Sequence, residues 1–169
     1  MPSTKSAARG FQDRAVLWSI GEICAIDIVA GACDALVAGL DTSALRILAA
    51  CTRAEADYDV PDLLPLALDE LDLVFYPVGS LAGREAAARM LAVQMLAGEL
   101  TPRELALRIH QRFGHGLPLV ERLAKLDDEY DILEYGDRTS KQVDAEIKAE
   151  ALRLAQHRRA PAEPTDASA

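Results

Sequence analysis

The sequence predicts an all-α protein, a single-domain bundle of six to seven helices around two central apolar helices. Half of the residues are hydrophobic but only 5% are aromatic, so the core is expected to consist of Leu, Ala, Ile and Val, as in helical proteins. Apolar residues recur mainly at helical spacing. The stretch with strand-like composition, LVFYPVGS (73–80), lacks a partner strand and is expected to be an extended linker whose Phe75 and Tyr76 reach the core.

The amino-terminal part is expected to begin with a flexible arm over residues 1–12. The first helix is predicted over 13–38, with Gly39 as its stop. Its apolar residues extend almost all round the helical wheel, which indicates central burial. A second helix is predicted to start at a cap formed by Asp41 or Thr42.

The middle of the chain is expected to hold a loop over 54–61, a third helix over 62–72 and a fourth over 81–97. The fourth helix is apolar over much of its surface and is the second central one. TPRE at 101–104 is a capping box that begins a fifth helix, and GHG at 114–116 ends it. The remaining predicted elements are a sixth helix over 118–135, a seventh over 140–158 and a disordered tail over 159–169, so that the helical domain covers 13–158.

The net charge of −9 argues against direct nucleic-acid binding, because a phosphate backbone would repel the chain and no basic run exceeds Arg158-Arg159. An acidic protein is suited to meeting a basic protein partner, although the charge can also serve solubility alone. The apolar stretch 15–38 contains Glu22, Asp27 and Asp34, and each acid is costly at the centre of a bilayer, so no membrane span is expected there. No signal peptide is evident.

Cys24, Cys33 and Cys51 form no C-x-x-C pair and lie within apolar stretches. They are expected to be small buried side chains in a reducing cytoplasm rather than parts of a disulfide or zinc framework. The excess of Arg over Lys, together with abundant Ala, suggests a bacterial coding sequence.

The stretch LAKLDDEYDILEYGD (123–137) is dense in carboxylates. On a helical wheel, Asp127, Asp131 and Glu134 form a ridge beside an apolar stripe, and Asp128 points outward. The stripe that should face the core consists of Leu119, Leu123, Leu126, Tyr130 and Leu133.

Like charges at this spacing destabilise a helix, so something is expected to compensate the ridge. Arg108 and Arg112 of the preceding helix could pair with it internally, a basic partner could meet it, or a divalent ion could bind. A metal site is not predicted, because one ridge converges poorly without ligands from a second helix. The residues predicted to bind a partner are Asp127, Asp128, Asp131 and Glu134.

Other candidate chemistry is sparse. His110 and His115 straddle a predicted helix end, and their spacing does not suggest a zinc site. Asp27 and Asp34 share a face of the first helix and are either paired in the core or part of a pocket. Phosphate-loop, dinucleotide, nucleophile-elbow, H-E-x-x-H and EF-hand patterns are absent, which favours a non-enzymatic protein without a cofactor.

Three stretches, DALVAGLDTSALRILAA (34–50), LTPRELALRIHQRFGHG (100–116) and LDDEYDILEY (126–135), resemble a group of small all-helical actinobacterial proteins of unassigned function. The resemblance covers about half of the chain and implies a helical fold, and it carries no catalytic residue over to this sequence.

Together, these features predict a non-enzymatic, acidic protein-binding module of the immunity-protein or antitoxin type, located in the cytoplasm. Its acidic helix face would meet a basic protein partner. The alternative is a helical small-ligand-binding or enzymatic domain with a pocket near Asp27 and Asp34, and a third reading is a structural helper that acts as a homodimer.

Overall fold

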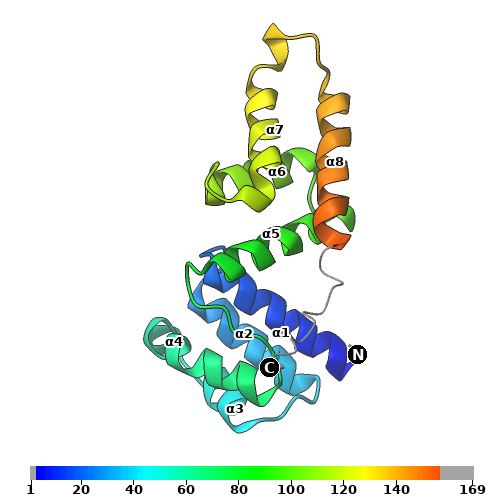
Figure 1. The fold of residues 1–169 in the computed structure, drawn as a ribbon. Coiled ribbons are helices and arrows are strands. Elements are labelled where there is room, and N and C mark those ends of the chain that lie inside the picture. Colours follow the sequence, from blue (N-terminus) through cyan, green and yellow to red (C-terminus); the bar gives the residue numbers. More distant parts are fainter. Residues whose placement is uncertain (1–2, 157–169) are drawn as a thin grey trace, which may run out of the picture. The chain divides into compact units, whose positions relative to one another are not determined.

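The computed structural model describes residues 3–156 of the chain. Within this range all regular structure is helical, with eight α-helices, two short 3₁₀-helices and no strand (Figure 1). The all-α class predicted from the sequence is therefore confirmed.

The contacts between residues group the chain into two compact units, Met1–Ala87 and Ala88–Ala169. The boundary falls inside helix α5, which spans Leu81–Leu96 as the sequence predicted to within one residue. The extent of one domain over 13–158 stays a prediction.

The first unit contains four helices that precede α5. Helix α2 contacts α1, α3 and α4, and its apolar side chains form the middle of the core. The largest of the fully buried side chains in this core are Phe11, Ile28, Leu45, Leu48, Leu64 and Leu68. The four helices are α1 (Thr4–Ser19), α2 (Ala25–Val37), α3 (Ser43–Ala49) and α4 (Arg53–Glu70).

The predicted first helix is in fact two helices, because a turn over residues 20–24 separates α1 from α2. Gly21 in this turn has a φ of +73°, which a residue with a Cβ adopts only at a cost. The Cys24 amide then donates to the Asp27 carboxylate at 2.8 Å, which caps the start of α2.

The predicted arm over 1–12 is wrong for residues 4–12, which are helical. The Ser6 amide donates to the Ser3 hydroxyl at 3.2 Å and so fixes the helix start, and Phe11 is only 2% exposed. Because Phe11 packs into the core, the amino-terminal segment is held in place.

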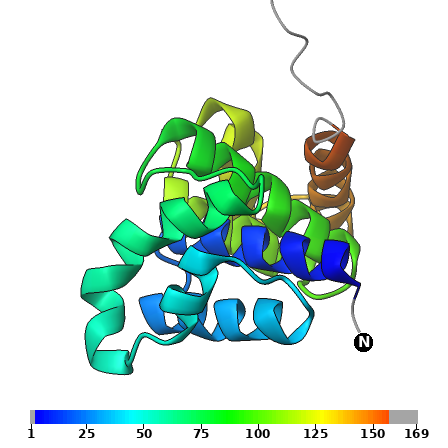
Figure 2. The same ribbon diagram turned by 90° about the horizontal axis from the view of Figure 1, so that it is seen from below.

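The predicted loop over 54–61 is also helical, since α4 begins at Arg53. The Glu55 carboxylate accepts from the Thr52 amide at 2.8 Å and from the Thr52 hydroxyl at 2.7 Å, a capping arrangement written in the sequence as T-x-x-E. Pro61 and Pro65 lie inside the helix, where each lacks a backbone donor, and α4 bends along its length (Figure 2).

The segment that follows α4 is the predicted linker and contains no strand over residues 71–80. The Gln12 side chain fixes it to α1, since its amide donates to the Val74 carbonyl at 2.6 Å and its oxygen accepts from the Val74 amide at 2.7 Å. As expected, Phe75 is half-buried against the core of the first unit.

In the second unit α6, α7 and α8 contact one another, and Figure 1 shows α7 and α8 running antiparallel. Leu105, Ile109, Leu123, Leu126 and Ile147 are fully buried among these helices. The elements after α5 are α6 (Pro102–Phe113), η1 (Pro118–Val120), α7 (Glu121–Asp131), η2 (Leu133–Tyr135) and α8 (Ser140–Gln156).

The helix ends in this unit differ in part from the sequence prediction. The predicted helix over 118–135 is interrupted, because α7 ends at Asp131 and a separate 3₁₀ turn follows. Helix α8 starts at Ser140 as predicted, whereas its predicted end at 158 and the tail over 159–169 lie outside the described residues.

The cysteines are less buried than the sequence suggested. Cys24 and Cys33 are exposed, and Cys51 is half-buried. Burial raises the pKa of the Cys51 thiol, and the nearby acids Asp59 and Glu55 raise it further. Across residues 3–156, none of the helices has the length and apolar character needed to cross a membrane.

Candidate functional site

Helix α6 positions the first candidate side chain. The Thr101 hydroxyl accepts from the Glu104 amide at 3.2 Å, and the Glu104 carboxylate accepts from the Thr101 amide at 2.7 Å, so the predicted capping box is confirmed. At the other end the Gly114 amide donates to the His110 carbonyl at 2.8 Å, and Gly114 has a φ of +56°. His110 therefore lies in the last turn of α6, and His115 follows directly after the stop.

Helix α7 presents its apolar stripe to the core as predicted. Leu123, Leu126 and Tyr130 are buried, while Leu119 and Leu133 beyond its ends are half-buried. Asp127 is also buried, with only 7% of its surface exposed. Its carboxylate lies 2.9 Å from the Nδ1 atom of His110 on α6.

Of the alternatives left open for the ridge, internal pairing therefore applies to Asp127. The wheel of α7 alone could not show that α6 packs over this side of the helix. A buried carboxylate needs a partner in hydrogen-bonding distance, and His110 supplies it.

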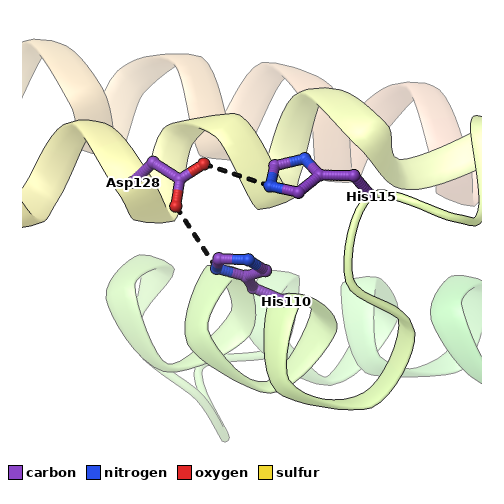
Figure 3. Close-up of side chains that lie close together, drawn as sticks. All are labelled: His110, His115 and Asp128. Atoms are coloured by element: carbon purple, nitrogen blue, oxygen red, sulfur yellow. Dashed lines mark ion pairs between the residues drawn. The ribbon is translucent and has the colours of Figure 1, made fainter.

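Asp128, the next residue, points at both histidines (Figure 3). One carboxylate oxygen lies 3.2 Å from His115 Nε2 and the other lies 3.7 Å from His110 Nδ1. The two imidazole rings meet edge to face with their centroids 4.9 Å apart. One ligand atom from each of His110, His115 and Asp128 lies within 4.8 Å of the others.

The sequence predicts no metal site because one helix alone offers poorly converging ligands. In the structure, His110 of α6 and His115 after it supply ligand atoms from outside α7. The signal was present in the sequence, because His110 and His115 are separated by four residues, within the range of three to five found between zinc-binding histidines. Only the fold brings Asp128 to them.

Glu129 belongs to a second cluster, which ties α7 to α8. Arg122 Nη1 donates to Glu129 at 3.0 Å, and Arg122 also pairs with Glu146 of α8. Arg138, which follows η2, pairs with both Glu129 and Glu146. We call these four residues the charge network; the hydrogen bond from Arg122 holds the pKa of Glu146 below its ordinary value.

Tyr130 makes a further link between the helices of the second unit. Its hydroxyl donates to Asp144 of α8, and the guanidinium of Arg103 lies 4.7 Å from the centre of its ring. Burial, followed by the hydrogen bond to Asp144, raises the pKa of Tyr130 to about 12. The phenol is therefore neutral across the physiological range and acts as a donor that fixes α7 against α8.

The internal partners of these acids include His110, His115, Arg122 and Arg138. The sequence suggests Arg108, Arg112 or similar groups for this role. His110 and His115 come from α6 and the segment after it, and the pairs of Arg122 and Arg138 with Glu146 link different elements. The helical wheel of 118–135 alone therefore does not show these partners.

Asp131 and Glu134, the other two predicted partner-binding residues, are exposed. They no longer share one helical ridge, since Glu134 lies in η2. Ile132, which lies between them, is 60% exposed, and Tyr135, which follows Glu134, is 81% exposed. We call the exposed side chains at this end of the α7–α8 hairpin the tip surface, which consists of Asp131, Ile132, Glu134, Tyr135 and Asp137.

A hollow of about 250 Å³ adjoins the tip surface. Its lining includes Ile132 of the tip and two members of the charge network, Glu129 and Arg138. The hollow therefore combines an apolar wall with a fixed guanidinium and carboxylate.

The alternative pocket, at Asp27 and Asp34, lies in the first unit. Asp34 pairs with Arg14 of α1 at 2.9 Å, and both line a hollow of about 120 Å³ between α1 and α2. Gly31 also lines it, and a Cβ at this position would come within 2.8 Å of Arg14 Cδ. Asp27 is not part of this lining and caps α2 instead, so both acids have roles in the fold.

Comparison of the whole chain with protein-family models, with curated proteins and with solved structures finds no match.

Proposed function

We propose that the protein is a non-enzymatic binding module that recognises a basic protein through its tip surface. The observation that carries this proposal is the exposure of Ile132 and Tyr135 among three acids at one end of a helical hairpin. An exposed apolar group rimmed by charge is typical of protein-interaction sites. Tyrosine in particular is enriched among the residues that dominate binding energy.

The support beneath the tip surface favours this role. The charge network joins α7, α8 and the segment between them, and the Tyr130 hydroxyl reaches Asp144. A contact surface held by such links loses little conformational freedom when a partner binds. The hollow beside Ile132 can also receive a side chain of the partner.

The contact residues differ in part from those that the sequence suggested. Asp131 and Glu134 remain, while Asp127 is occupied by His110 and Asp128 by both histidines. Ile132, Tyr135 and Asp137 join the set because they are exposed beside the two remaining acids.

The charge of the molecule favours a basic partner. The chain carries a net charge of −9, and three of the five residues of the tip surface are acids. Within this class we propose an immunity-protein or antitoxin role, in which the tip surface covers the active site of a basic toxin such as a nuclease. The small size and acidity of the chain agree with this role.

Affinity capture with two matched baits tests the proposal. One bait carries Asp131→Asn with Tyr135→Ala, and the other carries Asp59→Asn with Tyr58→Ala on α4. The match is close because Tyr58 and Tyr135 are each 81% exposed. We expect a basic protein from the native host to be enriched by the wild-type chain and the α4 variant, and lost with the tip variant.

Two results would contradict the proposal. A partner captured equally by the tip variant would place the binding surface elsewhere, and a tip-dependent dimer of the chain itself would support the homodimer reading instead. For the toxin role, a toxin-like reading frame found next to the gene is to be co-expressed with each variant. Relief of growth arrest by the wild type and the α4 variant but not by the tip variant is the expected outcome.

A further inference from the structure

We propose that His110, His115 and Asp128, with Asp127 adjacent to them, form a binding site for one divalent first-row transition ion of the Zn²⁺ type. The ligands come from the last turn of α6, the segment that follows it, and the middle of α7. This site lies outside the tip surface and does not depend on the proposed function.

The distances between the ligand atoms fit a tetrahedral ion. Metal–ligand bonds of about 2.0–2.1 Å at tetrahedral angles place neighbouring ligand atoms roughly 3.3 Å apart. The observed separations are 3.2 Å from Asp128 to His115, 3.7 Å from Asp128 to His110 and 2.9 Å from Asp127 to His110. The ligand atoms of His110, His115 and Asp128 all lie within 4.8 Å of one another, and rotation of the half-exposed His115 and Asp128 side chains can bring them around one ion.

The donor set selects the class of ion. Two imidazole nitrogens with carboxylate oxygens suit Zn²⁺ and its first-row neighbours. Mg²⁺ and Ca²⁺ prefer ligand sets composed of oxygen alone. The site is therefore expected to discriminate between these two groups of cations.

Burial places one side of the site inside the unit and leaves the other open. The side chain of Asp127 is 9% exposed and that of His110 is 29% exposed, whereas His115 and Asp128 are about half exposed. An ion can thus enter from solvent past His115 and Asp128 and reach the buried pair.

Charge gives a physical reason for an ion at this place. Asp127 and Asp128 are adjacent acids that face the same imidazole. A divalent cation compensates both carboxylates and leaves the imidazoles neutral, as metal ligation requires. Bound there, the ion would also join the end of α6 to α7.

Titration calorimetry of the metal-free, full-length chain with Zn²⁺ tests the site. We expect one ion per chain with micromolar or tighter affinity, and no binding of Mg²⁺ or Ca²⁺ under the same conditions. His115→Ala and Asp128→Asn should each weaken Zn²⁺ binding by at least about tenfold. Both side chains are half exposed, so these variants are expected to fold.

Asp131→Asn is the matched control, because it removes one charge from α7 without removing a ligand, and its affinity for Zn²⁺ should equal that of the wild type. Co²⁺ provides a second readout: d–d absorption without a thiolate charge-transfer band is expected. A thiolate band would assign the ion to the cysteines and overturn the site. A flat Zn²⁺ titration, or an unchanged one in His115→Ala, would overturn it as well.

Discussion

Asp127 and Asp131 occupy the same helix one turn apart, yet their surroundings differ. Asp127 is buried against His110, while Asp131 is exposed at the carboxyl end of α7. A buried group that loses its hydrogen-bond partner costs about 1–3 kcal/mol, whereas an exposed acid at a helix carboxyl end is slightly unfavourable. The two acids should therefore respond in opposite ways to the same substitution.

In metal-free protein, Asp127→Ala is expected to lower the free energy of unfolding by about 1–3 kcal/mol, because His110 Nδ1 is left without its nearest acceptor. Asp131→Ala should leave it unchanged or raise it by a few tenths of a kcal/mol. Urea denaturation followed by circular dichroism measures both values. Equal effects of the two substitutions would contradict the assigned burial of Asp127.

At the scale of elements, the charge network joins helices that are not neighbours in sequence. Arg122 and Glu129 belong to α7, Glu146 belongs to α8, and Arg138 lies in the segment between them. Paired with both arginines, Glu146 ionises more readily than in the unfolded chain, so its folded-state pKa lies below 4.5. The network is partly open to solvent, and its contribution to stability is accordingly limited.

We expect Glu146→Gln to lower the urea midpoint at pH 7, with the difference from the wild type narrowing as the pH falls. A carboxyl group with a depressed folded-state pKa contributes stability that is complete above its unfolded pKa. That contribution is lost as the pH falls from about 4.5 through the folded-state pKa. Urea titrations between pH 7 and pH 3 measure this contribution. If the difference in urea midpoint between the wild type and Glu146→Gln stayed constant over this range, the stabilisation would not come from the ion pairs of Glu146.

At the scale of the whole molecule, the net charge of −9 sets the long-range field that a partner meets first. Complementary charge between two proteins mainly raises their association rate. Salt screens this attraction, with a screening length of about 10 Å at 0.1 M. The exposed acids of α4 and those of the tip surface both contribute to this field, but only the latter would touch the proposed partner.

For the basic partner obtained by capture, the association rate is expected to fall steeply as NaCl rises from about 50 to 500 mM. Asp131→Asn with Glu134→Gln and Asp137→Asn should slow association at low salt and make this dependence shallower. The control is a triple variant on α4, which removes three negative charges away from the tip surface through Asp57→Asn, Asp59→Asn and Asp62→Asn. Stopped-flow or surface-plasmon kinetics compare the two, and a larger effect of the α4 variant would contradict contact through the tip surface.

The sequence by itself determined features that depend on neighbouring residues. The all-α class, the extent of α5, the capping box at Thr101 and the stop at Gly114 follow from local spacing and turn chemistry. The core stripe of α7 followed from periodicity for the same reason. Two further local signals are present in the sequence: Thr52 with Glu55, which starts α4 in place of the expected loop, and the spacing of His110 and His115.

Only the tertiary structure decided which carboxylates are buried against another helix and which are exposed to solvent. Helical periodicity places Asp127, Asp131 and Glu134 on one side of a helix, but it does not show that α6 covers Asp127 or that α7 ends before Glu134. Asp27 and Asp34 lie on one helix as predicted, but the tertiary structure gives them different partners, since Asp27 caps α2 and Asp34 pairs with Arg14 of α1. The physical reason is that a carboxylate's role depends on what packs against it, and those groups come from elements distant in sequence.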